Sequence, residues 1–417
     1  MSMQHLASGE REQRQLELLQ ATLNRAYRNV PFHQNRQNTL AQRSGRDPSI
    51  IERVEEIAAL PFMERKHLGE HYPYGLFAVP LKDIVRIHTA PGTTRDPTVT
   101  GYTRQDLRIW KEMVGRALAA AGITSEDILQ IDLDPGLANW GRDYKDGAES
   151  LDVAVIPNTP LSSRKHLMVL RDYKTSALVT TPSRAVQLTD LMFKAELNPT
   201  ALNLKRLILV GESLGEETRQ HLESQLHVET WHHFGLSEVP GPAIAFECRE
   251  HAGLHINEAH FFPEIVDPDT GEVLPRGEAG ELVLTTLTTR AFPLIRFRTG
   301  EKARLIPEPC ACGMPALRME WFEQRTDDIL NINGVKVHQN QIVRHIEAAL
   351  SFVPSFRADV REASGEKKHL EILVAMDDRL FSDEIKVLEN RIQRSESALL
   401  ENLGVPVRVR LAETGLI

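Results

Sequence analysis

A loop rich in glycine and threonine follows an apolar run, residues 84–87, in the N-terminal half of the chain. The loop covers residues 88–97 and places Thr93 and Thr94 directly after Gly92. Backbone amides and hydroxyl groups can both point into such a loop, which is a common way to bind phosphate. An ordinary surface turn has a similar composition, so both interpretations stay open from this segment alone.

A second segment, residues 231–238, combines an aromatic residue, a glycine and a carboxylate. Phe234, Gly235 and Glu238 occur in the order that suits stacking on a nucleobase beside a cation ligand. His232 and His233 precede them and could act as bases, although histidines beside an aromatic turn are more often packed in a core. The segment indicates a nucleotide site of modest specificity.

The three cysteines suggest a metal site. Cys248 lies shortly before His255, and Cys310 and Cys312 form a tight knuckle, so soft ligands from two segments could close a tetrahedral zinc site. His251 is an alternative fourth ligand, and three reduced structural thiols are the simplest alternative to a metal. The odd number of cysteines argues against a disulfide framework.

The elements that position these residues change in type along the chain. Helical stretches alternate with short apolar runs from residue 107 to 226, which indicates an α/β domain with parallel strands. Strands joined by turns between residues 264 and 305 predict an antiparallel subdomain. After Arg325 the pattern indicates a small α+β domain, so we expect a large domain over residues 1–325, a small one over 326–417 and a hinge near Thr326 and Asp327.

Composition excludes some classes of function. The formal net charge is -9, with 41% hydrophobic and 26% charged residues, so the chain has no basic footprint for nucleic acid. It also has no apolar run of the roughly 18 residues that a membrane helix needs. We therefore expect a cytoplasmic protein without nucleic-acid or membrane partners.

Together, the ordered motifs resemble the phenylacetate-coenzyme A ligase family of the acyl-adenylate-forming superfamily. The motifs that carry the resemblance are residues 72–80, 88–97, 231–238, 264–274, 293–300 and 325–328. The resemblance implies a large N-terminal α/β domain with an antiparallel subdomain and a small mobile C-terminal α+β domain. It also implies an enzyme that uses adenosine nucleotides and coenzyme A.

The resemblance assigns roles to single residues. Phe234 would stack on adenine with Gly235 beside it, Glu238 would lie near magnesium and, with Thr93 and Thr94, would be catalytic. The remaining nucleotide and thiol contacts would come from Gly211, Glu212, Ser213, Glu301, Arg325 and Gly334. Glu301 would bind the ribose in place of the family's aspartate, and Gly334 would line the tunnel for CoA or phosphopantetheine. Some relatives carry a similar cysteine and histidine pattern with structural zinc.

Departures from the family pattern gather in the ATP-handling half. Ala90 and Pro91 replace serines of the phosphate loop, and Asp96 replaces its lysine. The sequence ends at Ile417, before the position of the family's catalytic lysine, and its last lysine is Lys386. Because losing a positioned cation typically costs about 10²- to 10³-fold in rate, we expect ATP and Mg²⁺ to be used poorly or not at all.

Three functions from different classes follow. The first is acyl transfer, with an aryl group as the expected acyl group, through a CoA or carrier-protein thioester, with adenylation weakened or lost. The second is an ATP-dependent aryl-CoA ligase with an acyl-AMP intermediate, and the third is a non-catalytic scaffold. The acyl group would lie near residues 132–141, whose acids and Trp140 differ from the family's segment. We expect a small aromatic acyl substrate, and a carrier protein and a homodimer stay open as partners.

Overall fold

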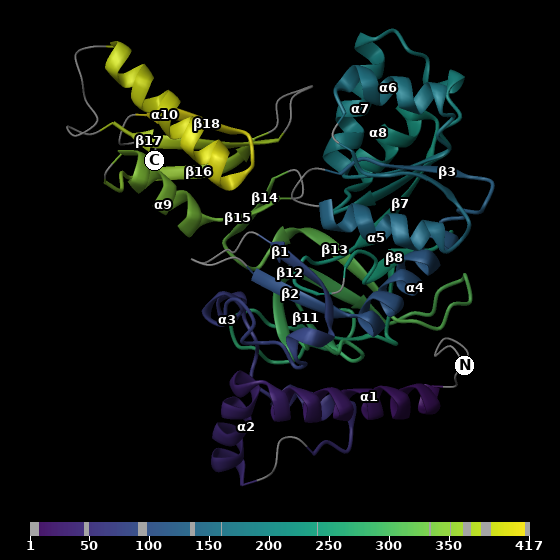
Figure 1. Cartoon of the computed structure of the whole chain (residues 1–417), viewed down its shortest axis with the longest axis vertical. Helices are drawn as coiled ribbons and strands as arrows, with labels where there is room; N and C mark the ends of the chain where they lie inside the picture. Colours follow the sequence, from purple (N-terminus) through teal and green to yellow (C-terminus); the bar gives the residue numbers. More distant parts are fainter. Residues whose placement is uncertain are drawn as a thin grey trace.

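The computed structural model describes most of the chain. The described residues are 8–45, 50–90, 98–133, 138–159, 161–239, 241–332, 335–350, 352–361, 368–376 and 385–412. Helices α1 (Ser8–Asn29) and α2 (Pro31–Ser44) lie at the end of the molecule opposite helix α10 (Figure 1). Leu19 and Leu23 of α1 are fully buried and belong to a hydrophobic cluster with Leu287 and Ile295, which fastens this helix to the main body.

A single eleven-stranded sheet forms the main body, in the order β10-β11-β12-β13-β9-β8-β7-β6-β5-β3-β4. The strands β3 (Ile128–Ile131), β4 (Ala154–Ile156), β5 (Ala177–Thr180), β6 (Arg206–Val210) and β7 (Glu229–Phe234) pair in parallel. Helices α4 (Arg104–Ala120), α5 (Ala138–Glu149), α6 (Ser163–Asp172), α7 (Pro182–Lys194) and α8 (Glu216–Leu226) alternate with them in the chain. The predicted α/β domain with parallel strands is confirmed.

The other half of the sheet is antiparallel. Its strands are β8 (Ala245–Glu247), β9 (Leu254–Ile256), β10 (Phe261–Val266), β11 (Ala279–Thr286), β12 (Phe297–Ile306) and β13 (Arg318–Arg325). The predicted antiparallel region is therefore present, and it continues the parallel sheet through the antiparallel pair β7 and β8.

Local sequence explains where the helices begin. Thr103 caps α4, since its hydroxyl accepts from the Asp106 amide at 3.2 Å while the Asp106 carboxylate accepts from the Thr103 amide at 2.8 Å. Pro182 begins α7 after the Thr181 cap, because proline is tolerated in the first turn of a helix. These caps lie at the end of the strand before α4 and directly after β5, and each begins the helix that comes next.

A short hairpin and connecting helices complete the N-terminal half. The 3₁₀ helix η2 (Val54–Ala59), helix α3 (Arg65–Glu70) and the 3₁₀ helix η3 (Leu81–Asp83) precede the antiparallel pair of β1 (Ile84–Ala90) and β2 (Thr98–Thr103). A further 3₁₀ turn, η5 (Pro199–Ala201), precedes β6. Helix α3 carries Arg65, which contacts the site described below.

The C-terminal part, residues 329–412, has its own hydrophobic core. It contains the pair β14 (Ile329–Ile332) and β15 (Val335–His338), helices α9 (Gln339–Leu350) and α10 (Ile385–Leu403), and a sheet of β16 (Phe356–Arg361), β17 (His369–Ala375) and β18 (Val407–Ala412). Figure 1 shows this part beside the sheet, next to the end of β13. The domain boundary at residues 325 and 326 stays a prediction.

Within the described part of the chain, the structure has no helix whose length and apolar character would let it cross a membrane.

Candidate active site

The loops after β6 and β7 meet at one edge of the sheet, where parallel strands of α/β proteins commonly bind ligands. Gly211 follows β6 with φ 83°, a left-handed conformation that favours glycine. The Glu212 carboxylate accepts from the Ser183 amide at 3.1 Å and its hydroxyl at 2.7 Å. The Glu212 side chain therefore holds the start of α7, and Ser213 lies beside it on the wall of a cavity.

Phe234 ends β7 and is fully buried. The ring of Trp321, on β13, meets it edge to face at 4.8 Å and lies nearly parallel to His232 at 5.1 Å with an angle of 13°. Trp321 is only partly buried, so it is the more accessible of these two rings. Stacking of Phe234 on adenine stays a prediction. Trp321 is an aromatic residue of the site that the sequence pattern did not predict.

Glu301 on β12 is buried, and both of its carboxylate oxygens are bound. Oε1 accepts from Nη1 of Arg325, and Oε2 accepts from the indole N–H of Trp321 at 3.1 Å. Arg325 also binds Asp327 through two N–H groups at 2.7 Å each and the Thr299 carbonyl at 3.0 Å. These carboxylates raise the pKa of Arg325 despite its burial, so the predicted residues Glu301 and Arg325 form one fixed ion pair.

Glu238 is held by Arg65 of α3, which sequence analysis also missed. Arg65 forms an ion pair with Oε1 of Glu238, donates to the Thr299 carbonyl at 2.8 Å and lies 3.9 Å from Asp327. Burial lowers the pKa of Arg65 to about 10, and Arg325 acts in the same direction. Oε2 of Glu238 is buried without a hydrogen-bond partner among the described residues, which leaves one oxygen available to a cation.

A cavity of about 300 Å³ lies beside Glu301, between the sheet and the C-terminal part; we call it the interface cavity. Glu212, Ser213, Glu301 and Arg325 line it together with Lys368, so five residues from distant segments meet there. The predicted site residues Gly211, Glu212, Ser213, Glu301 and Arg325 are thus near one another. Thr93, Thr94 and Gly334 lie outside the described residues, as do Pro91 and Asp96 of the same loop.

Gly235 continues from Phe234 in a crowded turn. A Cβ at this position would lie 2.8 Å from the Gly241 carbonyl and 2.9 Å from Cα of Pro242. Any side chain would therefore push the loop after β7 away from Trp140, whose ring is 3.1 Å from the same point. This close approach explains the need for glycine between Phe234 and Glu238.

The predicted acyl segment begins with a buried charge cluster. Asp132 directly follows β3 and binds Arg184 of α7 through Nε at 3.1 Å and His166 of α6 at 3.1 Å. Burial raises the pKa of Asp132, but His166 and Arg184 outweigh it and bring the value down to about 2. Farther along, Tyr144 of α5 shares a 2.8 Å hydrogen bond with His233 in the core. This buried hydrogen bond favours the interpretation of His233 as a packed core residue over its interpretation as a catalytic base.

The predicted metal ligands Cys248, His255, Cys310 and Cys312 form a cluster. Their ligand atoms all lie within 4.8 Å of one another, with Cys248 Sγ 3.7 Å from Cys310 Sγ and Cys312 Sγ 3.4 Å from His255 Nε2. A tetrahedral zinc with bonds of about 2.3 Å to sulfur and 2.0 Å to nitrogen requires separations of roughly 3.8 and 3.5 Å, so the cluster fits zinc. His251 lies outside it, with Nδ1 3.3 Å from Glu247.

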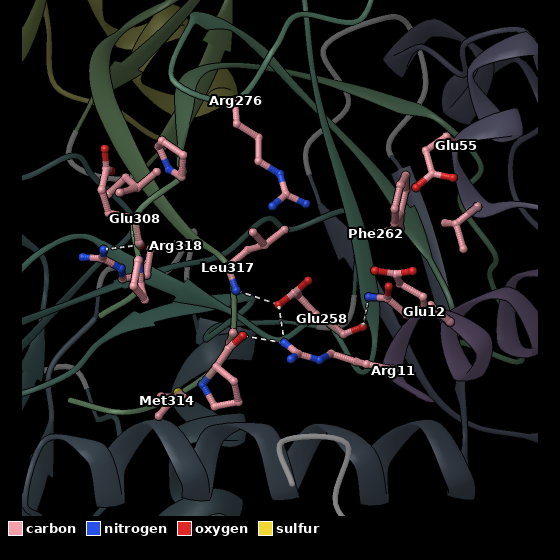
Figure 2. A pocket seen from close by; sticks show the side chains of 17 residues that line it. Arg11, Glu12, Glu55, Glu258, Phe262, Arg276, Glu308, Met314, Leu317 and Arg318 are labelled. Carbon is pink, nitrogen blue, oxygen red and sulfur yellow. Dashed lines mark hydrogen bonds and ion pairs between the residues drawn. The ribbon is translucent and has the colours of Figure 1, made fainter. Parts of the chain in front are cut away.

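The segment after Cys312 is fastened to the N-terminal helix. Figure 2 shows a second cavity, of about 300 Å³, between α1 and residues 306–318. Glu258 accepts from the Leu317 amide at 2.6 Å, and Arg11 of α1 donates to the Pro315 carbonyl at 2.5 Å. The cysteine knuckle therefore joins the sheet on one side and α1 on the other.

The chain is similar to several known proteins. A family model described as AMP-binding enzyme matches residues 150–288. The phenylacetate-coenzyme A ligase of Thermus thermophilus is 36% identical over 401 residues, which cover 93% of this chain and 89% of that one. The crystal structure of 2-hydroxyisobutyryl-CoA ligase with 2-HIB-AMP and CoA in its thioesterification state gives a TM-score of 0.87 at 23% identity, over 99% of this chain and 88% of that chain. Its postadenylation state with 2-HIB-AMP gives 0.71 over the same shares at the same identity.

The ligase relative, the family match and the fold together place the chain among the enzymes of the adenylate-forming superfamily. On the identity and coverage of the Thermus relative, the chain belongs to the phenylacetate-coenzyme A ligase family.

Proposed function

We propose that this protein is an ATP-dependent ligase that joins an aromatic carboxylic acid to coenzyme A through an acyl-adenylate. The observation that best supports this function is the Glu301 carboxylate, which Arg325 and Trp321 hold at the wall of the interface cavity. A fixed, buried carboxylate suits a ribose diol, because two hydroxyl groups can donate to its two oxygens. A scaffold would have no need of this arrangement.

The relatives favour the ligase over the acyltransferase that the sequence departures suggested. The Thermus relative carries the name of a ligase and covers most of this chain. The predicted loss of adenylation depends on Ala90 and on Pro91 and Asp96, and the last two lie outside the described residues. Transfer to a carrier protein is therefore the second candidate.

The chemistry takes place in two steps. A carboxylate oxygen of the acid attacks the α-phosphorus of ATP and pyrophosphate leaves; the CoA thiolate then attacks the acyl carbon and AMP leaves. Glu301 would orient the ribose in both steps. Glu238, whose Oε2 has no hydrogen-bond partner among the described residues, would hold a magnesium ion. That ion would neutralise phosphate charge, while Arg65 holds the Glu238 carboxylate in place.

The position of the C-terminal part supports the assignment of this conformation to thioester formation. The structure of 2-hydroxyisobutyryl-CoA ligase gives a TM-score of 0.87 against this chain in its thioesterification state and 0.71 in its postadenylation state. Asn331 of β14 donates to the Gly211 carbonyl at 3.0 Å and joins the C-terminal part to the loop after β6. We infer that the C-terminal part changes position between the two steps and stands here as in thioester formation.

Zinc would have a structural role in this enzyme. Cys248, His255, Cys310 and Cys312 would supply a closed set of four ligands, which leaves no coordination position for a substrate. The ion would tie the turn after β8 to the loop between β12 and β13, and through Pro315 and Leu317 to Glu258 and α1. It would stabilise the antiparallel half of the sheet.

Purified protein tests the function directly. Aromatic acids, phenylacetate first, are supplied with ATP and CoA, and AMP release and acyl-CoA are measured; acyl-CoA plus holo carrier protein without ATP is the parallel assay. The ligase predicts AMP and acyl-CoA in equal amounts that depend on the acid. Acyl transfer to the carrier without ATP would support the acyltransferase instead, and inactivity in both assays would favour a scaffold.

A further inference from the structure

Two tryptophans hold the loop that follows β7. Trp140 of α5 lies against its first residue, since a Cβ on Gly235 would be 3.1 Å from Cη2 of the indole. Trp110 of α4 lies against the other end of the loop, where a Cβ on Gly241 would overlap the indole nitrogen. Both tryptophans are almost fully buried. The loop, which carries Glu238, is therefore packed between α4 and α5.

The side chains of β7 point to two opposite sides of the sheet. Phe234 contacts Trp321 on one side, next to the proposed ribose carboxylate. His233 points to the other side, because successive side chains of a strand alternate, and there it shares its hydrogen bond with Tyr144 of α5. Trp140 precedes Tyr144 by about one helical turn and lies on the same face of α5. An aromatic wall therefore covers the end of β7 on the side away from Trp321.

The proposed chemistry restricts where the acid can lie. Its carboxylate has to reach the α-phosphorus, and Glu238 would hold the magnesium ion beside the phosphates. The lining of the interface cavity, on the Trp321 side, includes four acidic residues, and like charges there would repel the acid. An aromatic ring needs apolar neighbours, which the indole of Trp140 supplies beside the loop that carries Glu238. These requirements favour the α5 side of the loop.

We propose that Trp140 forms the far wall of the acyl site and limits the size of the acid, an inference that rests on the ligase function proposed above. The indole lies where the additional atoms of a larger acid would have to go, and a packed interior yields such space only at a cost in free energy. Acids with a single ring, such as phenylacetate, fit in front of it, whereas a second fused ring does not. Trp140 is thus a specificity-determining residue that contacts the ring of the acid and takes no part in the chemical steps.

The test compares wild type with Trp140→Ala and Trp140→Phe, using phenylacetate and 2-naphthylacetate as the two acids. The measured quantity is the ratio of kcat/KM for 2-naphthylacetate to kcat/KM for phenylacetate in acyl-CoA formation. We expect Trp140→Ala to raise this ratio by roughly tenfold or more, since a single methylene in an apolar pocket is worth about 10- to 200-fold. Trp140→Phe removes only part of the indole, so its ratio should lie in between, and it keeps a ring in the core if the alanine variant folds poorly.

Trp110→Ala is the matched control. It removes a buried indole from the same loop, but at the Gly241 end and from α4. A loop that merely loosens slows the reaction of both acids alike, so Trp110→Ala should keep the wild-type ratio even if its rates fall. The proposal would be overturned if neither Trp140 variant changed the ratio, or if Trp110→Ala changed it as much as Trp140→Ala does.

Direct binding separates a failure of this proposal from a failure of the ligase function. Calorimetry with the phenylacetyl and 2-naphthylacetyl sulfamoyl adenosines, which are stable analogues of the two acyl-adenylates, requires no turnover. We expect wild type to bind the phenylacetyl analogue more tightly by roughly tenfold or more, and Trp140→Ala to lose that preference. Equal affinities in wild type, or no binding of either analogue, would refute the wall at Trp140. The expected preference without any formation of acyl-CoA would contradict the ligase function alone.

Discussion

Trp321 donates its indole N–H to Oε2 of Glu301 over 3.1 Å, while Arg325 binds the other oxygen of the same carboxylate. The tryptophan thus connects the proposed ribose-binding carboxylate to the aromatic contacts of His232 and Phe234. A change at Trp321 should therefore reach the nucleotide through Glu301.

Trp321→Phe keeps an aromatic ring but removes the N–H donor. A buried acceptor without its partner costs about 1–3 kcal/mol, so we expect a lower unfolding free energy and a KM for ATP raised roughly three- to tenfold. Trp231→Phe is the control, because the indole nitrogen of buried Trp231 has no hydrogen-bond partner among the described residues. A KM for ATP that rises equally in both variants would contradict a specific role for the Trp321 N–H.

Removal of Arg65 should destabilise the protein. Arg65→Ala leaves the buried Glu238 without its cation, whereas Arg325 still binds Asp327, and breaking one side of a buried pair typically costs about 3–5 kcal/mol. Arg53→Ala serves as the control, since Arg53 and Glu55 form a pair that is 75% and 66% exposed. We expect that control to change the unfolding free energy by less than about 0.5 kcal/mol in urea titrations. Equal losses in the two variants would show that the buried pair is not a stabilising contact.

Motif order predicted residues that the structure brings near one another, because these residues follow or lie within strands of one sheet. Phe234 closes β7, Glu212 follows β6, and Glu301 lies within β12, so their neighbourhood follows from the strand pattern. Arg65 and Trp321 were missed because their importance comes from contacts with Glu238 and Glu301 that no local pattern reveals.

Long-range pairing also explains the unpredicted part of the fold. The sequence predicted parallel strands and an antiparallel region, yet gave no reason to join them in one sheet. The join depends on β9, a strand of three residues that pairs with both β8 and β13. Strands this short have a weak sequence pattern. The register that pairs His255 with Arg318 is set by packing across the sheet.

Zinc should be present at about one ion per chain, a stoichiometry that follows from the closed ligand set. We expect mass spectrometry to find it in protein purified without chelator, and Cys310→Ser/Cys312→Ser to lose it and unfold at lower temperature. His251→Ala is the control, because His251 lies outside the ligand cluster, and it should keep its zinc. Zinc near zero in the wild type, or zinc retained in the double cysteine variant, would exclude the site.

The last prediction concerns the pH dependence of stability and follows from Asp132. His166 and Arg184 outweigh burial and lower the pKa of Asp132 to about 2, below its value of about 3.9 in an unfolded chain. A carboxyl group with a depressed folded pKa stabilises the protein above the unfolded pKa, and this contribution is lost as pH falls from about 4 to about 2. Its size is about 2–3 kcal/mol.

Asp132→Asn removes that contribution and serves as the test. Wild type should exceed the variant in unfolding free energy at pH 6, and the difference should shrink steadily below about pH 4. Asp172→Asn is the control, because Asp172 pairs with Arg171 at the exposed surface and should give a small difference at every pH. A difference between wild type and Asp132→Asn that stays constant from pH 5 to about pH 2.5 would show that the buried cluster does not hold Asp132 ionised.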